Sequence, residues 1–251
     1  MARLDSLLKF KGSVDDLTVR KTKNGHAVYK KVKGATKEDV ATKKNYARVR
    51  ENLAEMDRAA EAARLFTMAL NDLTADCTDT GLQLRMASKM MEVLLTDPVS
   101  DRGQRQVMNG DIGLFKDFSL NRFSSLRSIF NKPVDSSIDR VSGKLQLKIP
   151  AFIPVEAIKA PAKTSHIKIH AAAFEINFST GVFVVKTVAS DPIPVQGKDL
   201  NKEINFELDA NPNSTNPLFL VMGIRFYQEV NGKFYQFFEK ASAVLFIADA
   251  V

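Results

Sequence analysis

The side chains best suited to metal binding in this chain of 251 residues are three histidines and one cysteine. His166 and His170 are four residues apart in a segment with strand-like composition, so we expect them to share a face. Zinc requires three or four ligands. His26 falls in an expected turn, Cys77 falls in a distant helical region, and neither an HExxH nor a CxxC motif occurs. We therefore expect ordinary surface or core histidines and no metal site.

The sequence contains no clear motif for nucleophilic or acid–base catalysis. No Gly-x-Ser-x-Gly motif occurs, and the acids beside Cys77 would oppose formation of a thiolate. The carboxylate pairs, Asp15-Asp16, Glu51/Glu55 and Glu203/Glu207, are each explained by a turn or a solvated face. Acid–base pairs of the glycosidase kind face each other across a cleft at about 5–10 Å, a geometry that a sequence does not reveal. We expect a protein that is not an enzyme.

Phosphate-binding loops are also missing from the sequence. No Walker or GxGxxG pattern occurs, and residues 34–37 resemble only the end of a P-loop, without its upstream glycine. We therefore expect no cofactor. Single-strand nucleic-acid binders present several aromatic side chains, and Tyr29 is the aromatic residue within the basic N-terminal run. The candidate contacts for an anion or a protein interface are Lys21, Lys23, Lys30, Lys31 and Lys33.

These lysines belong to a strongly basic N-terminal fifth. Residues 1–50 carry a net charge of +9, residues 51–131 carry −3 and residues 132–251 carry +1, which accounts for the total of +7. Three interpretations stay open: a solvated edge guarded by lysine, a complementary contact with the acidic middle of a neighbouring copy, or a contact with nucleic acid.

The elements that must position these residues begin with a β-ribbon over residues 1–34. Alternating segments flank Asn24-Gly25, and Asn-Gly between such segments is the strongest short signal for a hairpin. We therefore predict a hairpin over 17–32. A ribbon of two or three strands is marginal alone, so it must lie on its own chain or on a neighbour, as a possible exchange arm.

A helical region is predicted over residues 35–113. No Pro or Gly interrupts 39–73, and an apolar stripe recurs at helical spacing through Val49, Leu53, Met56, Ala60, Ala63 and Leu70. A second helix over 82–95 places Leu82, Met86, Met90, Val93 and Leu94 on one face and ends at Asp97-Pro98. The two form a helical hairpin, with a short third helix at 102–108 and a linker at 110–113.

The remaining residues, 114–251, are typical of an antiparallel β-sandwich of about seven strands. The expected strands are 116–121, 143–149, 165–178, 181–188, 202–208, 217–230 and 233–248, the last of which can divide near residue 239. Asn231-Gly232 marks a second hairpin turn. The fold class is therefore α+β, with a ribbon, a helical hairpin and a C-terminal sandwich.

The N-terminal quarter carries a motif of its own. Residues 11–26 read K-G-S-V-D-D-L-T-V-R-K-T-K-N-G-H, followed by R-V-R-E-N at 48–52. This pattern resembles a group of uncharacterised proteins from Bacteroidota, whose openings read approximately K-G-T-I-G-D-I-T-F-Y-K-T-x-D-G. The chain departs from that group at Asp15, where the group has Gly, and at Val19-Arg20, where it has Phe-Tyr. The resemblance covers about residues 9–66 and implies a basic ribbon-plus-helix module without assigning any functional residue.

These observations favour a non-enzymatic structural subunit that assembles with itself into a homo-oligomer, filament, tube or lattice, such as a virion or appendage component. The alternatives are a nucleic-acid-binding accessory protein and a ligand- or glycan-binding β-sandwich. Neither a signal peptide nor an apolar run of about 20 residues is visible. We therefore expect no membrane partner and a location in the cytoplasm or in an assembled particle.

Overall fold

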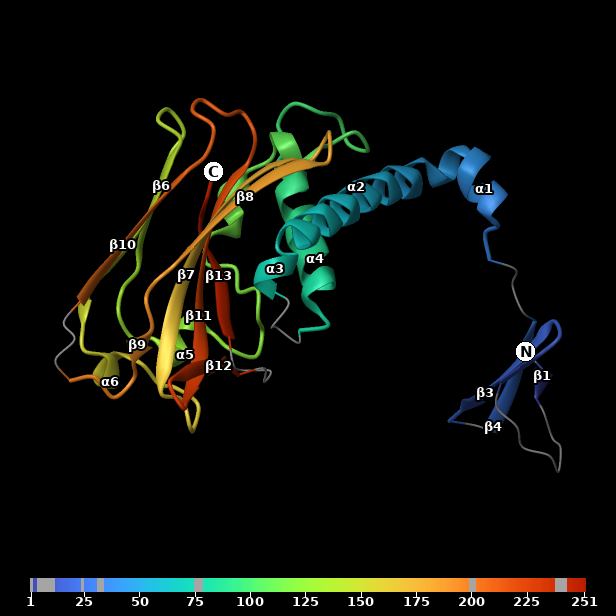
Figure 1. Ribbon diagram of the computed structural model, residues 1–251. Coiled ribbons are helices and arrows are strands. Elements are labelled where there is room, and N and C mark those ends of the chain that lie inside the picture. Colours follow the sequence, from blue (N-terminus) through green and yellow to red (C-terminus); the bar gives the residue numbers. More distant parts are fainter. Residues whose placement is uncertain are drawn as a thin grey trace. The chain divides into compact units, whose positions relative to one another are not determined.

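A computed structural model describes residues 2–3, 12–23, 25–30, 34–74, 79–198, 202–237 and 243–251 (Figure 1). Contacts divide the chain into two compact units, Met1–Arg50 and Glu51–Val251. The fold is α+β, with an N-terminal ribbon, a pair of helices and a C-terminal antiparallel sandwich, as predicted. The predicted boundary between residues 113 and 114 stays a prediction.

The first unit contains a small antiparallel sheet with the strand order β1-β4-β3-β2. Its strands are β1 (Ala2–Arg3), β2 (Gly12–Val14), β3 (Leu17–Thr22) and β4 (Gly25–Lys30). Pairing of β3 with β4 runs from Leu17 opposite Lys30 to Thr22 opposite Gly25, which confirms the predicted hairpin. The expected turn residue Asn24 lies outside the described residues.

The turn between β2 and β3 gives Asp15 a φ of +48°, in the left-handed region. Asp enters this region more readily than most residues because its short polar side chain bonds locally. The proteins that the N-terminal motif resembles have Gly here, for which this conformation carries no Cβ penalty. The departure at Asp15 therefore keeps the turn at some cost in backbone strain.

The predicted helix over 39–73 is interrupted near its start, which corrects the sequence analysis. Helix α1 spans Lys37–Thr42 and a 3-10 turn, η1, spans Lys44–Tyr46. Between them Lys43 is extended. Arg50 Nη1 donates to the carbonyl of Lys43 at 3.0 Å and to a carbonyl of α1 at 2.7 Å. The guanidinium thus satisfies carbonyls that a helix end leaves without partners.

Three helices follow: α2 (Ala47–Ala69), α3 (Asn71–Thr74) and α4 (Leu82–Leu95). The buried residues of α4 are the five that the sequence places on one face: Leu82, Met86, Met90, Val93 and Leu94. That prediction is confirmed.

The predicted apolar face of α2 is wrong over its first half. Leu53 and Met56 are 48% and 61% exposed. The buried residues of the helix are instead Glu55, Ala59, Ala62, Ala63, Phe66 and Ala69. Alanine-rich helices offer similar apolar content on several faces, so spacing alone does not select the packed one. Small alanine side chains let α2 lie close to its neighbours.

Two antiparallel sheets make up the sandwich. The larger, six-stranded sheet contains β7 (His166–Asn177), β8 (Val182–Ala189), β9 (Ile193–Pro194), β11 (Leu218–Val230), β12 (Lys233–Gln236) and β13 (Ala243–Ala250). The smaller, three-stranded sheet contains β5 (Asp135–Asp139), β6 (Lys144–Phe152) and β10 (Lys202–Asp209). Short helices α5 (Leu126–Ile129) and α6 (Pro154–Ala157) lie in the connections.

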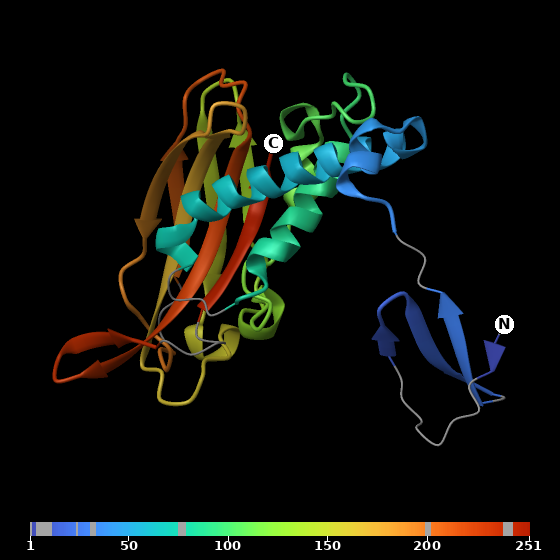
Figure 2. The same cartoon turned by 90° about the vertical axis from the view of Figure 1, so that its right-hand side faces the viewer.

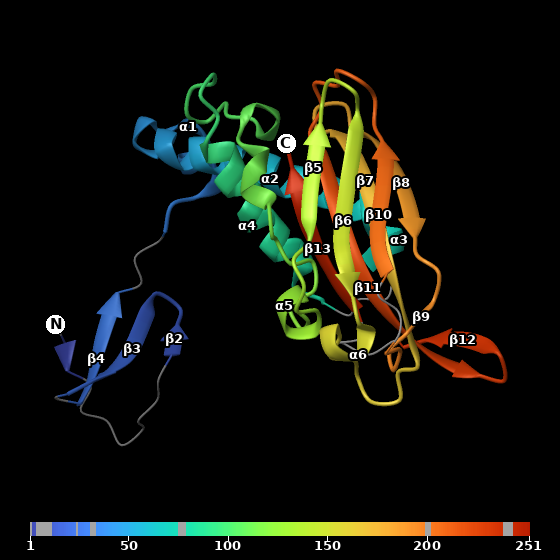
Figure 3. The same ribbon diagram turned by 90° about the vertical axis from the view of Figure 1, so that its left-hand side faces the viewer.

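The second unit therefore has three layers. Helix α2 crosses one face of the larger sheet in Figure 2, and the smaller sheet covers the other face in Figure 3. On β7, Ala172 and Phe174 belong to the core shared with the helices, whereas Ala171 and Ala173 belong to the core between the sheets. Burial on both faces explains the long apolar runs in the central strands, such as residues 171–174 of β7 and 218–222 of β11.

Most predicted strands match within a few residues. The predicted strand at 233–248 divides into β12 and β13, whereas the one at 116–121 reduces to a single bridge of Ser119 with Phe246. The polar strand β5 was not predicted. In the second Asn-Gly hairpin both turn residues have positive φ, as expected for type I′.

The predicted third helix at 102–108 is wrong: only a 3-10 turn, η2 (Val107–Asn109), lies there. The predicted linker at 110–113 is anchored to the core through one side chain and one close backbone contact. Ile112 in the turn η3 (Ile112–Phe115) is buried, and Gly110 packs directly on the backbone of Val93.

Candidate interaction surfaces

The candidate lysines of the N-terminal sheet are divided between one face and a turn. Lys21 lies opposite His26 and Lys30 lies opposite Leu17, so Lys21 and Lys30 share a face. Lys23 lies in the turn, and Lys31 and Lys33 lie outside the described residues.

Tyr29 pairs with Thr18 and so lies on the other face of the sheet from Lys21 and Lys30. A base stacked on Tyr29 would not meet these two lysines. Arg20, which lies opposite Ala27, is a cation on the same face as Tyr29.

The small sheet has little core of its own. Among the residues described in Met1–Arg50, the buried apolar side chains are Val19 and Ala27. Val19 pairs with Val28, and Ala27 pairs with Arg20, the residue next to Val19 on β3. Because neighbouring residues of a strand point to opposite faces, Val19 and Ala27 lie on opposite faces of the sheet. Helix α1 buries no residue. Leu17 is half exposed on the face of the two lysines.

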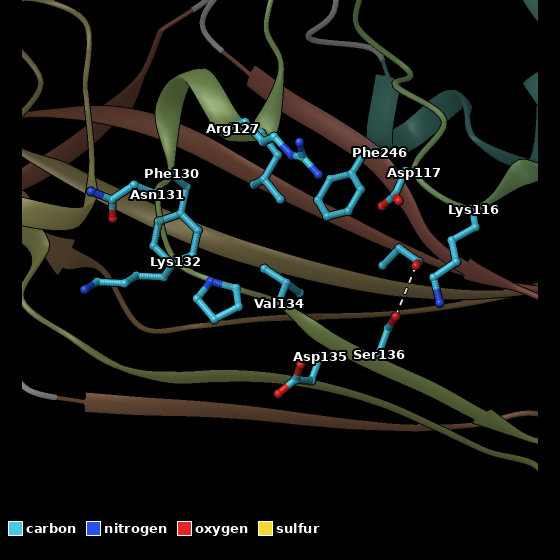
Figure 4. Close-up of a pocket in the computed structure, with 13 residues that line it drawn as sticks. Lys116, Asp117, Arg127, Phe130, Asn131, Lys132, Val134, Asp135, Ser136 and Phe246 are labelled. Atoms are coloured by element: carbon cyan, nitrogen blue, oxygen red, sulfur yellow. Dashed lines mark hydrogen bonds between the residues drawn. The ribbon is translucent and has the colours of Figure 1, made fainter.

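A groove of about 720 Å³ opens on the side of the sandwich where β5 approaches β13. Phe130 and Phe246 line it, and the charged side chains around them have both signs: Lys116, Asp117, Arg127, Lys132 and Asp135 (Figure 4). Ser136 Oγ donates to the carbonyl of Ala248 at 3.1 Å, so this hydroxyl ties two strands together. The residues lining the groove include no His that could act as a general base toward Ser136.

A second cavity, of about 610 Å³, lies between the end of α2 and strand β8. His170 lines it together with Met68, Phe183 and Arg225. Arg225 donates to the carbonyl of Leu73 at 3.2 Å, which fastens α3 to β11.

The two strand histidines do not form a metal site in the part of the chain that the structure describes. His166 lies against Ser165 Oγ at 3.0 Å and meets the ring of Phe234 edge-on at 4.7 Å. It supports the β11–β12 hairpin, while Cys77 lies outside the described residues.

Buried carboxylates were the polar feature that sequence reasoning missed. Glu55, Asp79, Asp97 and Glu175 are all buried, and each accepts hydrogen bonds from a connecting segment. Their signal in the sequence is weak, since an acid beside Gly, Ser or Asn is common in any loop.

Glu175 on β7 has the fullest set of partners. It accepts from Ser214 Oγ at 2.6 Å, Asn216 Nδ2 at 3.0 Å and Asn211 Nδ2 at 2.7 Å, so it fixes the loop between β10 and β11. Burial alone would raise the pKa of the Glu175 carboxyl, but these hydrogen bonds hold it below its ordinary value.

Asp79 plays a similar part before α4. It accepts from the backbone N–H of Gly81 at 2.9 Å and from Arg85 Nη2 at 2.6 Å. Burial would raise the pKa of the Asp79 carboxyl, but the Arg85 bond and the backbone bonds lower it. A carboxylate held in this way is an acceptor for its loop and is poorly placed to move protons.

No protein-family model, curated protein or solved structure matches this chain. Among the helices that the structure describes, none is long and apolar enough to cross a bilayer. The N-terminal resemblance brings no functional residue with it, so the surfaces of the molecule itself carry the functional argument.

The exposed apolar side chains are concentrated on a few elements of the second unit. Helix α2 exposes Leu53 and Met56, the β11–β12 hairpin exposes Phe234 and Tyr235, and β8 exposes three consecutive residues, Val182, Phe183 and Val184. The hairpin projects from the sandwich (Figure 3). Contiguous exposed apolar groups are a common feature of interaction surfaces.

Proposed function

We propose that this protein is a non-enzymatic structural subunit. It assembles with itself into a homo-oligomer, filament, tube or lattice, and its N-terminal ribbon contacts a neighbouring subunit. The observation that carries the proposal is the small N-terminal sheet, in which Val19 and Ala27 are the buried apolar side chains among the described residues. A sheet of this size needs a further apolar surface for stability.

Charge supports a partner of the same kind. Residues 1–50 carry +9 and residues 51–131 carry −3, so the basic end of one copy is complementary to the middle of another. Helix α2 adds an exposed apolar strip through Leu53 and Met56, which a neighbouring copy could cover.

The non-enzymatic part of the proposal is supported by how the acids are used. Asp79, Asp97 and Glu175 are buried, and hydrogen bonds to loops and arginines lower their pKa. A general acid or base works best with a pKa near the operating pH, so these three carboxyls are shifted in the unfavourable direction.

Deletion of residues 1–34 tests the proposal. Both apolar cores lie within residues 59–250, so the shortened chain should keep its fold. We expect the full chain to form large assemblies by light scattering, and the shortened chain to form smaller particles while its circular dichroism still shows a folded α+β protein. Equal particle sizes for the two chains would contradict the role of the ribbon.

A point substitution in the full-length chain tests the role of the ribbon without removing any residue. Leu17 is half exposed beside Lys30, so Leu17→Asp should leave the hairpin paired while changing the surface that it offers. We expect weaker assembly for Leu17→Asp than for Thr22→Asp, a change at the far end of the same strand.

A further inference from the structure

Three outer strands of the sandwich, β5, β10 and β13, are protected against pairing with another chain. Strand β5 is polar, with the sequence Asp-Ser-Ser-Ile-Asp, and β10 carries four charges among its eight residues. Natural sheets guard their edges with charged and polar residues in this way.

The edge of β13 is protected by a covering segment. The backbone N–H of Asp117 donates to the carbonyl of Ile247 at 2.8 Å, and Ile247 N–H donates back to Phe118 at 2.9 Å. Leu120 N–H extends the pairing to Leu245 at 2.8 Å. Residues 117–120 therefore occupy the hydrogen-bonding groups that β13 would otherwise offer.

Strand β8 lacks such protection. It pairs with β7 from Val182 opposite Asn177 to Ala189 opposite His170, and β7 is its strand partner in the part of the chain that the structure describes. Its sequence, V-F-V-V-K-T-V-A, contains one charge, Lys186, and is rich in residues that favour strands. Val182 and Val184 are 62% and 46% exposed.

The pairing with β7 assigns each side chain of β8 to a face. Val184 and Lys186 pair with Glu175 and Ala173 and therefore lie on the side of the smaller sheet. Both side chains are nevertheless exposed. Phe183 and Val185 pair with Ile176 and Phe174 and face the helices. Both faces of the edge are thus largely apolar.

We propose that β8 is the contact with a second copy of this chain, and that two β8 strands pair antiparallel about a two-fold axis. The contact rests on the proposed function, since it requires self-association, and it specifies one interface of the assembly. A two-fold interface needs a surface complementary to itself. An almost uncharged strand meets that need. A strongly charged partner would find only Lys186 as an opposite or like charge along β8.

The single lysine selects the register. In a symmetric antiparallel pair that keeps the two faces aligned, the axis passes through one residue position of the strand. An axis at Lys186 sets two lysines directly opposite each other, which is unfavourable. An axis at Val184 or Thr187 shortens the ladder.

An axis at Val185 gives the longest ladder without opposing lysines. It pairs Val182 with Val188, Phe183 with Thr187, and Val184 with Lys186 of the second copy. Flanking side chains must add to the ladder to reach the roughly 800 Å² per partner of a stable dimer. Met68 supplies such area, because it is exposed and lines the same cavity as Phe183.

Substitutions of opposite charge at position 184 test this register. Val184→Lys places a new lysine opposite Lys186 of the second copy, twice per dimer, and should weaken dimerisation about tenfold. Val184→Glu places a carboxylate there and should strengthen dimerisation by a similar factor at low salt. Sedimentation equilibrium of the full chain at several salt concentrations measures both effects.

The matched controls are Val141→Lys and Val141→Glu. Val141 is 71% exposed in the turn between β5 and β6, so the same charge changes there should leave the dimer affinity unaltered. At concentrations where the protein is monomeric, thermal melts of all four variants should overlay that of the wild type, since neither valine is buried.

The outcomes separate the two proposals. Suppose that the wild type associates while both position-184 variants show its dimer affinity, or while both lower that affinity equally. Either result overturns the β8 pairing and leaves self-assembly standing. A wild type that stays monomeric at all concentrations overturns self-assembly and the β8 contact together.

Discussion

The ring of Phe66 on helix α2 meets the ring of Phe219 on strand β11 edge-on, with centroids 4.6 Å apart and planes inclined at 69°. Phe115 and Phe174 complete the cluster, at 5.9 Å and 6.2 Å from Phe66, and all four rings are fully buried. Edge-to-face pairs add stabilisation beyond the burial of their surface. This cluster fastens the helical layer to the larger sheet.

We therefore predict that Phe66→Ala lowers the free energy of unfolding by about 3–5 kcal/mol. The loss combines the transfer of the ring with a cavity among three remaining rings. Urea unfolding followed by circular dichroism measures it. Leu53→Ala, on the exposed side of the same helix, should cost less than about 1 kcal/mol. Similar losses for the two variants would contradict the observed orientation of α2.

Glu55 on α2 should be a stability determinant although it is charged. Its Oε1 accepts from the backbone N–H of Gly103 at 2.7 Å, across 48 residues of sequence. Glu55→Ala leaves that buried N–H without its acceptor and should cost about 1–3 kcal/mol. Glu55→Gln keeps an amide oxygen at the position and should cost less.

The loop that Glu55 holds provides the second measurement. Limited proteolysis at Arg102 and Arg105 should be faster in Glu55→Ala than in the wild type, because release of Gly103 frees the segment. Glu61→Ala, on the exposed surface of the helix, is the control and should alter neither stability nor cleavage. Equal stability of the Ala and Gln variants would show that the hydrogen bond contributes nothing.

Gly110 should tolerate no side chain. A Cβ built there lies 2.2 Å from the carbonyl oxygen of Val93, in the core under α4. We predict that Gly110→Ala costs about 3 kcal/mol or prevents folding, since backbone must move to admit the methyl group. Differential scanning fluorimetry should show a lower Tm. Gly34→Ala, where nothing lies within 4 Å, should leave the Tm unchanged.

The parts of the fold that the sequence predicts well are those whose pattern is local. Helix α4 follows directly from apolar spacing between Leu82 and Leu94, and the β11–β12 hairpin follows from Asn231-Gly232. In each case the residues that define the element also make its main contacts, so no long-range information is needed.

The features that escaped prediction depend on partners distant in sequence. The buried face of α2 is decided by Phe219 and by the loop at Gly103, more than 40 residues away. Strand β5 is polar because it lies at an edge, so alternation does not reveal it. The open edge of β8 is equally hidden, since β7 and β8 are both rich in apolar residues and only the pairing shows which is covered.

Asp97 should make the free energy of unfolding depend on pH in the acidic range. Its Oδ1 accepts from the backbone N–H groups of Val99 and Ser100 at 2.8 Å and 3.2 Å, and its Oδ2 accepts from Gln106 N–H at 2.9 Å. Burial would raise the pKa of the Asp97 carboxyl, but these backbone bonds outweigh it and hold the pKa far below its ordinary value.

The folded-state pKa of Asp97 thus lies below the unfolded value of about 3.9. The stabilisation is therefore complete well above that value and is lost as the pH falls toward the folded-state pKa. Asp97→Asn should cost about 1–3 kcal/mol at pH 7, and the difference from wild type should shrink steadily below about pH 4.

Urea titrations between pH 7 and pH 2.5 measure this convergence. Asp101→Asn is the matched control, because Asp101 is an exposed acid four residues along the same loop. Its unfolding free energy should follow that of the wild type across the whole range. A difference between Asp97→Asn and wild type that stays constant down to pH 2.5 would mean that Asp97 holds the loop through its shape and not through its charge.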